Sequence, residues 1–585
     1  MTARVTNRIA ELKRPSPQFP RNYVPAELVI DSWEHIRPLF EELLNRELQS
    51  PQDLEKWLHD ISEVQAVISE EAARRYIAMT CATDDKDAEK AYIDYIENIQ
   101  PKTKPYADKI NHKLAESPYA KEIDADRYGI LLRSCQNSID LFRDENVALE
   151  TELNKLSQNY NKITGAQTVE FNGKEYTLQQ MSLFLEEQSR PLRQQAWEAM
   201  TGRRLQDAEA LDELLDQMLV LRQRVAKNAG FNNFRDYQFR VYERFDYSPE
   251  DCFKFHDTVE CYVVPVMRKA MQARKEALQL DILRPWDTAC DPYGRTALHP
   301  FVDTDQLVTG CQNIFNKVDA ELGGHFTEMI RYGLLDLESR KGKAPGGYQE
   351  DLSESRLPFI FTNAVGLNRD VFTLLHEGGH AFHQFLVQSE PLLAYRHAPI
   401  EFCEVASMGM ELLSMPYLDE FYSPTEVART VRDELENKLA LLPWVASIDA
   451  FQHWLYTNPG HTREERCDFW VELTERFGSG VDHTGYEQAQ RYRWQAQLHI
   501  FEVPFYYIEY GIAQLGALQV WSNYRKHPAA TIEAYKAALK LGGTKALPEL
   551  FDAATIRFDF TKETLQPLMA EVQEELEHQA QLERG

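Results

Sequence analysis

Basic residues are scarce in this chain relative to acidic ones. The 585 residues include 64 lysines and arginines against 92 aspartates and glutamates, which gives a formal net charge of −28. An acidic surface repels nucleic acid and anionic lipid headgroups, because all three carry negative charge. The composition therefore predicts that neither nucleic acid nor a membrane is a partner of this protein.

Long apolar runs and paired cysteines are also missing. No stretch reaches the roughly 18 consecutive apolar residues of a transmembrane helix. The basic segment 1–21 lacks the apolar core that a secretory signal needs. The eight cysteines are scattered and form no CxxC pair. Together these absences predict a cytoplasmic protein whose thiols are reduced.

Apolar residues recur at helical intervals over most of the chain, which predicts a mostly α-helical protein. The longest such patterns occupy residues 32–48, 51–79, 84–98 and 125–158. Asn172-Gly173 lies between two alternating runs and predicts a β-hairpin with a type I′ turn. We expect a basic, flexible arm over residues 1–24, an N-terminal helical region over 25–190 and a catalytic region over 191–585.

The segment 374–384 carries the strongest chemical signal in the sequence. It contains His376-Glu377-Gly378-Gly379-His380, which is the HExxH zinc signature. Residues four apart share one face of a helix, so His376 and His380 are expected to point at one metal ion. Glu377 lies next to the first ligand, where its carboxylate could reach a water bound to that metal. The motif therefore predicts a catalytic zinc site with Glu377 beside it.

The residues around this motif argue against an ordinary exposed helix. A surface helix with two solvated histidines would not need the apolar side chains that flank the motif, and ionisable groups are seldom buried without partners. Gly378 and Gly379 each cost about 1 kcal/mol of helix propensity. We interpret the two glycines as making room for a peptide backbone that passes close to the helix.

The acidic segment 397–415 is the natural source of a third ligand. A catalytic zinc commonly takes two histidines and one glutamate. Glu404 and Glu411 are seven residues apart on one helical face, and Glu401 is one turn before Glu404. Seven residues span about 10.5 Å of helix axis, so Glu404 and Glu411 are not expected to bind one ion together. The spacing alone leaves the choice of ligand open, and an acidic surface face is the alternative interpretation.

A short β-branched and aromatic segment, 358–363, predicts a strand shortly before the zinc helix. If this strand lies at an open edge, it can align an extended peptide by strand addition. Phe359, Ile360 and Asn363 are then candidate substrate-binding residues. If the strand is internal, it only supports the helix, and the pattern does not separate the two cases.

A cluster of aromatic residues, His499, Tyr506, Tyr507 and Tyr510, lies near the C-terminus of the chain. Phenol groups can stabilise an oxyanion that develops on a substrate carbonyl. An aromatic stripe on a helix more often belongs to the core. The residues alone therefore leave both interpretations open.

Several of these segments together resemble the M3 metallopeptidases, in particular the oligoendopeptidase F-like branch. The matching residues are Gly346-Gly347-Tyr348, Pro358-Phe359-Ile360, Asp370-Val371-Phe372-Thr373, the HExxH motif extended to His383, Glu401-Phe402-Cys403-Glu404-Val405-Ala406-Ser407, His499 and Pro504-Phe505-Tyr506-Tyr507. The resemblance implies a mostly α fold. It implies a large, helical, two-lobed body that encloses a deep substrate channel, with a small β element beside the zinc helix.

The resemblance also implies roles for individual residues. His376, His380 and Glu404 are the implied zinc ligands, with one Zn²⁺ per chain, and Glu377 is the implied general base. His383 is expected to support the site without binding the metal. Glu411 is expected to accept a hydrogen bond from a ligand histidine.

The resemblance also implies that the C-terminal aromatic cluster binds the substrate. His499 and a tyrosine near Tyr507 or Tyr510 are expected to hydrogen-bond the substrate and the oxyanion. The spacing leaves open whether Tyr506 or Tyr507 is the nearer match.

We therefore predict a zinc-dependent oligoendopeptidase that hydrolyses internal bonds of short, unfolded peptides. One alternative is a dipeptidyl carboxypeptidase or another zinc carboxypeptidase, which would need a cationic group such as Arg356 or Arg396 to hold the substrate's C-terminus. A second alternative is a catalytically silent, zinc-stabilised binding scaffold. Glu377 argues against that scaffold, because zinc binding alone does not require it.

Overall fold

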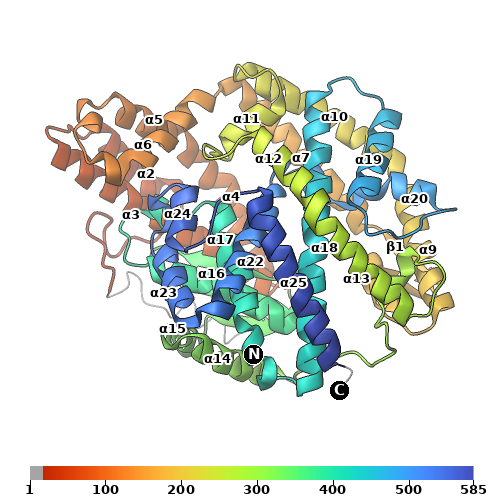
Figure 1. The fold of residues 1–585 in the computed structure, drawn as a ribbon. Coiled ribbons are helices and arrows are strands. Elements are labelled where there is room, and N and C mark those ends of the chain that lie inside the picture. Colours follow the sequence, from red (N-terminus) through yellow and green to blue (C-terminus); the bar gives the residue numbers. More distant parts are fainter. Residues whose placement is uncertain (1–17, 584–585) are drawn as a thin grey trace. The chain divides into compact units, whose positions relative to one another are not determined.

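The computed structural model describes residues 18–583, and helices make up most of the ribbon (Figure 1). Contacts divide the chain into two compact units, and each unit is built from three separate segments. Unit 1 comprises the residues up to 139, 298–430 and 513–558, and unit 2 comprises 140–297, 431–512 and the residues from 559 onward. The prediction of a mostly α-helical protein with a small β element is confirmed, and the enclosed substrate channel stays a prediction.

The helices of unit 1 are α2 (Trp33–Asn45), α3 (Pro51–Cys81), α4 (Lys86–Asn98), α5 (Gln100–Glu116), α6 (Ala125–Leu141), α14 (Thr304–Val318), α15 (Ala320–Tyr332), α16 (Asn368–Val387), α17 (Ile400–Ser414), α23 (Pro528–Leu539) and α24 (Leu547–Ala553). The helices of unit 2 are α7 (Asp144–Gly165), α8 (Leu178–Met181), α9 (Arg190–Gln206), α10 (Ala208–Asn228), α11 (Phe234–Val241), α12 (Pro249–Thr258), α13 (Val264–Ala277), α19 (Arg463–Phe477), α20 (Glu487–Arg491), α21 (Leu498–Glu502) and α25 (Lys562–Leu582). Two further helices, α18 (Pro424–Thr457) and α22 (Ile508–Lys526), contribute residues to both units, and the last two residues of α6 belong to unit 2.

The helix predicted over residues 125–158 is in fact two helices, α6 and α7. They are separated at Arg143, whose backbone is extended. The Arg143 side chain donates hydrogen bonds to the carbonyl oxygens of Asp140 and Phe142, at 2.9 and 2.6 Å. Carbonyls at the end of a helix have no partner within the helix, so this side chain stabilises the break. Apolar periodicity does not report such a local cap, and the prediction of one continuous helix is wrong.

The β-hairpin predicted around Asn172-Gly173 is confirmed in unit 2. Strand β1 (Thr168–Phe171) pairs with β2 (Lys174–Thr177) in antiparallel register. The two turn residues have φ values of 52° and 77°. A type I′ turn requires positive φ at both positions, which glycine and asparagine tolerate best.

The strand predicted at 358–363 is present as β5 (Leu357–Ala364), but it does not lie at an open edge. It is the centre of a three-stranded sheet, parallel to β3 (Leu335–Glu338) and antiparallel to β4 (Tyr348–Leu352). Phe359 and Ile360 are fully buried. The edge-strand hypothesis for β5 is therefore wrong, because both edges of β5 are already hydrogen-bonded to neighbouring strands. The sheet instead packs against α16.

Asn363, the third residue predicted to bind substrate from this strand, holds a loop in place. Its Nδ2 donates to the carbonyl oxygens of Ala344 and Gly346, both at 2.8 Å. These bonds fix the glycine-containing loop that leads into β4.

Three further expectations can be compared with the structure. Residues 1–17 of the predicted basic arm lie outside the described residues, and Arg21 forms an ion pair with Glu354 at 2.5 Å. All eight cysteines are free thiols. Within residues 18–583, no helix is long and apolar enough to cross a membrane.

Candidate active site

The HExxH residues lie on α16, whose glycines allow it to pack closely against two other helices. A Cβ atom on Gly379 would lie 2.6 Å from the Ala406 carbonyl oxygen and 2.6 Å from the Ser407 Cα, both in the backbone of α17. A Cβ atom on Gly378 would lie 2.6 Å from the Phe315 ring of α14. Contacts this short do not occur in packed interiors. The backbone that passes close to Gly379 is therefore that of α17, not that of a substrate, and Gly378 leaves room for the Phe315 ring.

This close packing brings three potential metal ligands together in unit 1. The Glu404 Oε2 atom lies 3.6 Å from His376 Nε2 and 3.8 Å from His380 Nε2. One donor atom from each of the three residues lies within 4.8 Å of the other two. Donors on a tetrahedral zinc at 2.0–2.2 Å are separated by about 3.4 Å. The two histidines and the glutamate therefore fit a zinc ion with little movement.

Glu411 and Ser407 of α17 orient this group of ligands. The Glu411 Oε1 atom lies 2.6 Å from His376 Nδ1. If Nδ1 carries the proton, the lone pair of Nε2 faces Glu404, which is the tautomer that metal binding requires. Burial disfavours the charged ring, but the hydrogen bond and the charge of Glu411 outweigh it and raise the pKa of His376 to about 9. Ser407 Oγ donates to Glu404 Oε2 at 3.0 Å.

Glu377 is buried, with 8% of its surface exposed, and it does not belong to the group of ligands. Burial raises the pKa of its carboxyl to about 7. The charge of His376 and, to a smaller extent, the Gln349 backbone of β4 oppose that shift. A carboxyl group that titrates near neutrality can both accept and return a proton at physiological pH.

His383 and Glu401 are buried but lie outside the group of three ligands formed by described residues. His383 Nε2 has no hydrogen-bond partner among the described residues. Burial lowers the pKa of His383 to about 4, so the ring is neutral. Neither residue therefore takes the place of Glu404 beside His376 and His380.

The predicted C-terminal cluster lies in unit 2 and is not one continuous helix. Phe505 has a φ of 67°, and it separates α21 from α22. The His499 ring centroid lies 4.7 Å from that of Tyr507, 6.0 Å from that of Tyr510 and 6.1 Å from that of Tyr506. The structure therefore brings all four predicted residues together, with Tyr507 nearest to the histidine.

Two residues outside this prediction hold His499 in place. Gln497 Nε2 lies 2.6 Å from His499 Nδ1, and Trp444 Nε1 donates to Gln497 Oε1 at 3.0 Å. Burial lowers the pKa of His499 to about 4. Trp444 is on α18 and more than fifty positions earlier in the chain, so no local pattern connects it with His499.

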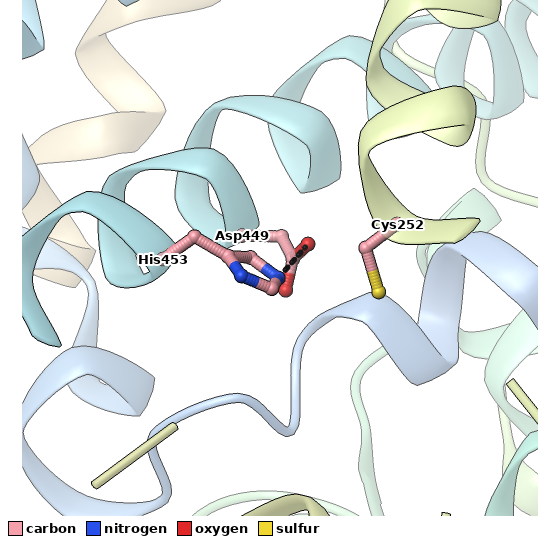
Figure 2. A group of neighbouring side chains, drawn as sticks. All are labelled: Cys252, Asp449 and His453. Atoms are coloured by element: carbon pink, nitrogen blue, oxygen red, sulfur yellow. Dashed lines mark ion pairs between the residues drawn. The ribbon is translucent and has the colours of Figure 1, made fainter. Parts of the chain in front are cut away.

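A second group of metal-type side chains, Cys252, Asp449 and His453, lies deep inside unit 2. Figure 2 shows Cys252 on α12 opposite the other two residues on α18. The Asp449 Oδ2 atom lies 2.8 Å from His256 Nε2 and 3.2 Å from His453 Nε2. One carboxylate shared by two imidazoles is an ordinary buried polar network. Burial also raises the pKa of the Cys252 thiol, which disfavours the thiolate form that binds metal.

The two arginines considered for a carboxypeptidase are both bound to carbonyl oxygens of unit 1. Arg356 Nη1 donates to the Gln388 carbonyl at 2.6 Å, and Arg396 Nη1 donates to the Ser353 carbonyl at 2.5 Å. Only 4% of Arg396 is exposed. Both side chains therefore stabilise the fold of this unit.

Comparison with protein families places the chain in a known class. The model described as peptidase family M3 matches residues 183–570, and a peptidase M3 N-terminal domain model matches residues 26–142. The chain therefore belongs to peptidase family M3, a family of metallopeptidases. The resemblance inferred from the motifs is confirmed.

Within that family, the chain is similar to oligoendopeptidases of the F type. The crystal structure of Pz peptidase A with an inhibitor superposes with a TM-score of 0.86 at 27% identity, over 95% of this chain and 99% of that one. A structure provisionally described as an oligoendopeptidase F gives 0.85 at 27% identity, over 95% and 98% of the chains. The oligoendopeptidase F homolog of Borreliella burgdorferi is 23% identical over 48% of each chain. The matched region spans about half the length of the curated relatives.

The close packing at Gly379 makes a testable prediction. In Gly379→Ala, the new methyl group must push α17 away from α16, because both of its nearest contacts are backbone atoms. Overpacking of this kind costs about 1–3 kcal/mol of stability. We expect a lower thermal unfolding temperature and weaker zinc binding, because Glu404 moves with α17.

Gly324→Ala is the matched control for this prediction. Gly324 lies in α15, and a Cβ atom there meets nothing within 4 Å. Alanine at an open helical position is neutral or stabilises by up to about 1 kcal/mol. If Gly379→Ala behaves like Gly324→Ala in both unfolding and zinc titration, the packing account is wrong.

Proposed function

We propose that this protein is a zinc-dependent oligoendopeptidase that hydrolyses internal bonds of short, unfolded peptides. The observation that carries the proposal is the convergence of His376, His380 and Glu404 at separations of 3.6–3.8 Å between Glu404 and the imidazoles, next to the buried carboxyl of Glu377. Membership of peptidase family M3 supports the same reaction.

The residues of α16 and α17 have separate roles in metal binding and proton transfer. His376, His380 and Glu404 would hold the zinc, and Glu411 fixes the tautomer of His376. A zinc ion bound there supplies a Lewis acid for the scissile carbonyl and lowers the pKa of a coordinated water to roughly 7. Glu377 accepts the proton of the attacking water and returns it to the leaving amine. Its raised pKa suits both transfers.

The cluster in unit 2 supplies the hydrogen bonds to the substrate. Trp444 donates to Gln497 Oε1, which turns the Gln497 amide so that its Nε2 donates to His499 Nδ1. The proton of the neutral His499 ring is then on Nε2, where it can be donated to a substrate carbonyl. Tyr507 and Tyr510 are the proposed donors to the oxyanion, and Tyr506 lies beside Tyr510 to contact the substrate.

Strand addition, if it aligns the peptide, would use β4 and not β5. β4 lies at an edge of the three-stranded sheet and contacts α16. Its Gln349 backbone also lies close enough to Glu377 to lower the pKa of that carboxyl. An extended peptide added there would run past the general base.

Digestion of a mixed peptide library, with products identified by mass spectrometry, tests this proposal. We expect internal cuts at no fixed distance from either end, and loss of cleavage after zinc removal that is restored by added zinc. Removal of one or two C-terminal residues from every peptide would favour the carboxypeptidase alternative. Zinc binding without any cleavage would favour the binding scaffold.

Substrate size gives a further prediction. Peptides of about 5–20 residues should be cleaved, whereas a stable folded protein should resist, because only an extended chain can pair with a strand edge. The measurement compares product formation from the peptide with that from a folded protein, whose native state is verified by circular dichroism. A reduced and unfolded form of the same protein is the control. Rapid digestion of the native form would rule out this size limit.

A further inference from the structure

Unit 2 contains a cavity of about 1050 Å³ whose charge differs from that of the whole chain. The chain carries a formal net charge of −28, yet four arginines and only two glutamates line this cavity. Pockets that bind small molecules or short peptide segments have volumes of about 300–1,000 Å³. The cavity is therefore large enough for a ligand, and its charge favours an anionic one.

Two of the four arginines are occupied by nearby protein groups. Arg268 donates to the carbonyl oxygens of Glu475 and Gly478, both at 2.9 Å. Arg274 donates to the Cys290 carbonyl and lies 4.0 Å from Glu436. These two side chains stabilise the wall of the cavity.

The other two, Arg204 and Arg493, have no carboxylate partner within residues 18–583. Both side chains line the cavity. Arg204 lies near the end of α9, and Arg493 lies just after α20 with its guanidinium 4.7 Å from the centre of the Trp444 ring. Burial and then the charge of Arg204 lower the pKa of Arg493, so the two guanidinium groups repel each other. An anion bound in this cavity would offset that repulsion.

The geometry around Arg493 connects this pair with the residues proposed to bind substrate. Trp444 contacts Arg493 through its ring and donates its Nε1 proton to Gln497. Gln497 in turn contacts His499. All of these residues belong to unit 2. A peptide held at His499 therefore has Arg493 within the same unit, with Trp444 and Gln497 as the side chains between them.

We propose that Arg204 and Arg493 form a carboxylate-binding subsite for peptide substrates. Guanidinium groups match the planar, two-oxygen geometry of a carboxylate, which is the usual anionic group of an unmodified peptide. The carboxylate comes either from the C-terminus of the peptide or from an aspartate or glutamate side chain. The inference rests on the proposed oligopeptidase function and adds a preference for acidic peptides to it.

The test compares kcat/KM for matched fluorogenic peptides. One pair differs only in a free or amidated C-terminus, and a second pair differs only in glutamate or glutamine at one position. The unchanged protein should prefer the charged member of at least one pair, and that pair identifies the source of the carboxylate. Arg204→Gln and Arg493→Gln should each reduce this preference about 10-fold, as expected for a charge-assisted hydrogen bond.

Two neighbouring arginines provide matched controls. Arg203 pairs with Asp207 at 2.7 Å, and Arg491 pairs with Asp468, and neither lines the cavity. Arg203→Gln and Arg491→Gln change the net charge equally but should leave the preference unchanged. Arg493→Lys keeps the charge and should retain part of the preference. In Arg204→Glu the preference should reverse toward a peptide with lysine at the same position.

Direct binding separates this inference from the proposed function. Fluorescence anisotropy with a labelled acidic peptide can be measured on the Glu377→Gln variant. The peptide should not be cleaved by this variant, so the measurement reports binding alone. Weaker binding in Arg204→Gln and Arg493→Gln, but not in the controls, supports the subsite even if no peptide is cleaved. Equal preference and equal binding in all four glutamine variants would overturn it, whether or not neutral peptides are hydrolysed.

Discussion

The Glu377→Gln variant is expected to bind zinc as the unchanged protein does and to lose nearly all peptide hydrolysis. Glu377 lies beside a ligand histidine but outside the group of three ligands formed by described residues, so glutamine should leave the metal site intact. Glutamine keeps the size of the side chain but cannot accept a proton from water. General-base catalysis contributes about 10²–10⁴-fold, and kcat/KM should fall by at least that factor.

The measurement combines kcat/KM for one fluorogenic peptide with zinc content by mass spectrometry. Glu401→Gln is the matched control, because Glu401 is an equally buried carboxylate of unit 1 outside the group of three ligands. It should keep both zinc and activity. Stoichiometric zinc together with unchanged activity in Glu377→Gln would show that another group is the base.

The second large effect is expected for Glu404→Ala, which should lose zinc. Glu404 supplies the one carboxylate oxygen near both histidines within the described group of three ligands, at 3.6 and 3.8 Å. Without it, two imidazoles remain, and two ligands hold zinc far more weakly than three. Glu411→Ala should weaken zinc binding by about 10–100-fold, because it removes a hydrogen bond to His376 and not one of the three ligands.

Zinc affinity by competition with a chelator distinguishes these variants, and circular dichroism checks that each is folded. Glu401→Ala should retain the affinity of the unchanged protein. Full affinity in Glu404→Ala combined with loss of zinc in Glu401→Ala would transfer the ligand role to Glu401. Loss of activity without loss of zinc in Glu404→Ala would contradict its assignment as a ligand.

Local sequence was sufficient to predict the helix that carries the two histidines of the candidate metal site. His376 and His380 are four residues apart on one helix, so their shared direction follows from helix geometry alone. The hairpin at Asn172-Gly173 is equally local, because its turn depends on the φ values that these two residues tolerate. The choice among the acidic residues of α17 came from a family motif, since spacing left Glu401 and Glu404 on similar faces.

The same patterns did not predict how separate helices and strands pack against one another. β5 has the composition of a strand in either position, and only its pairing with both β3 and β4 makes it internal. Gly379 indicated a close approach, but the approaching backbone is that of α17, the next α-helix, and helical periodicity does not show how two helices pack. Trp444 and Gln497 position His499 although no motif connects them.

Sequence patterns were enough to predict a mostly helical protein, its place among HExxH metallopeptidases and the two histidines that share a helix face. Those properties depend on residues within one or two helical turns, because the rise and the number of residues per turn of an α-helix are the same in every protein. Three features became visible only in the folded chain: the distance from Glu404 to the histidines, the internal place of β5, and the presence of Arg204 and Arg493 in one cavity. Each depends on contacts between different helices or strands, and those contacts are set by how whole elements pack.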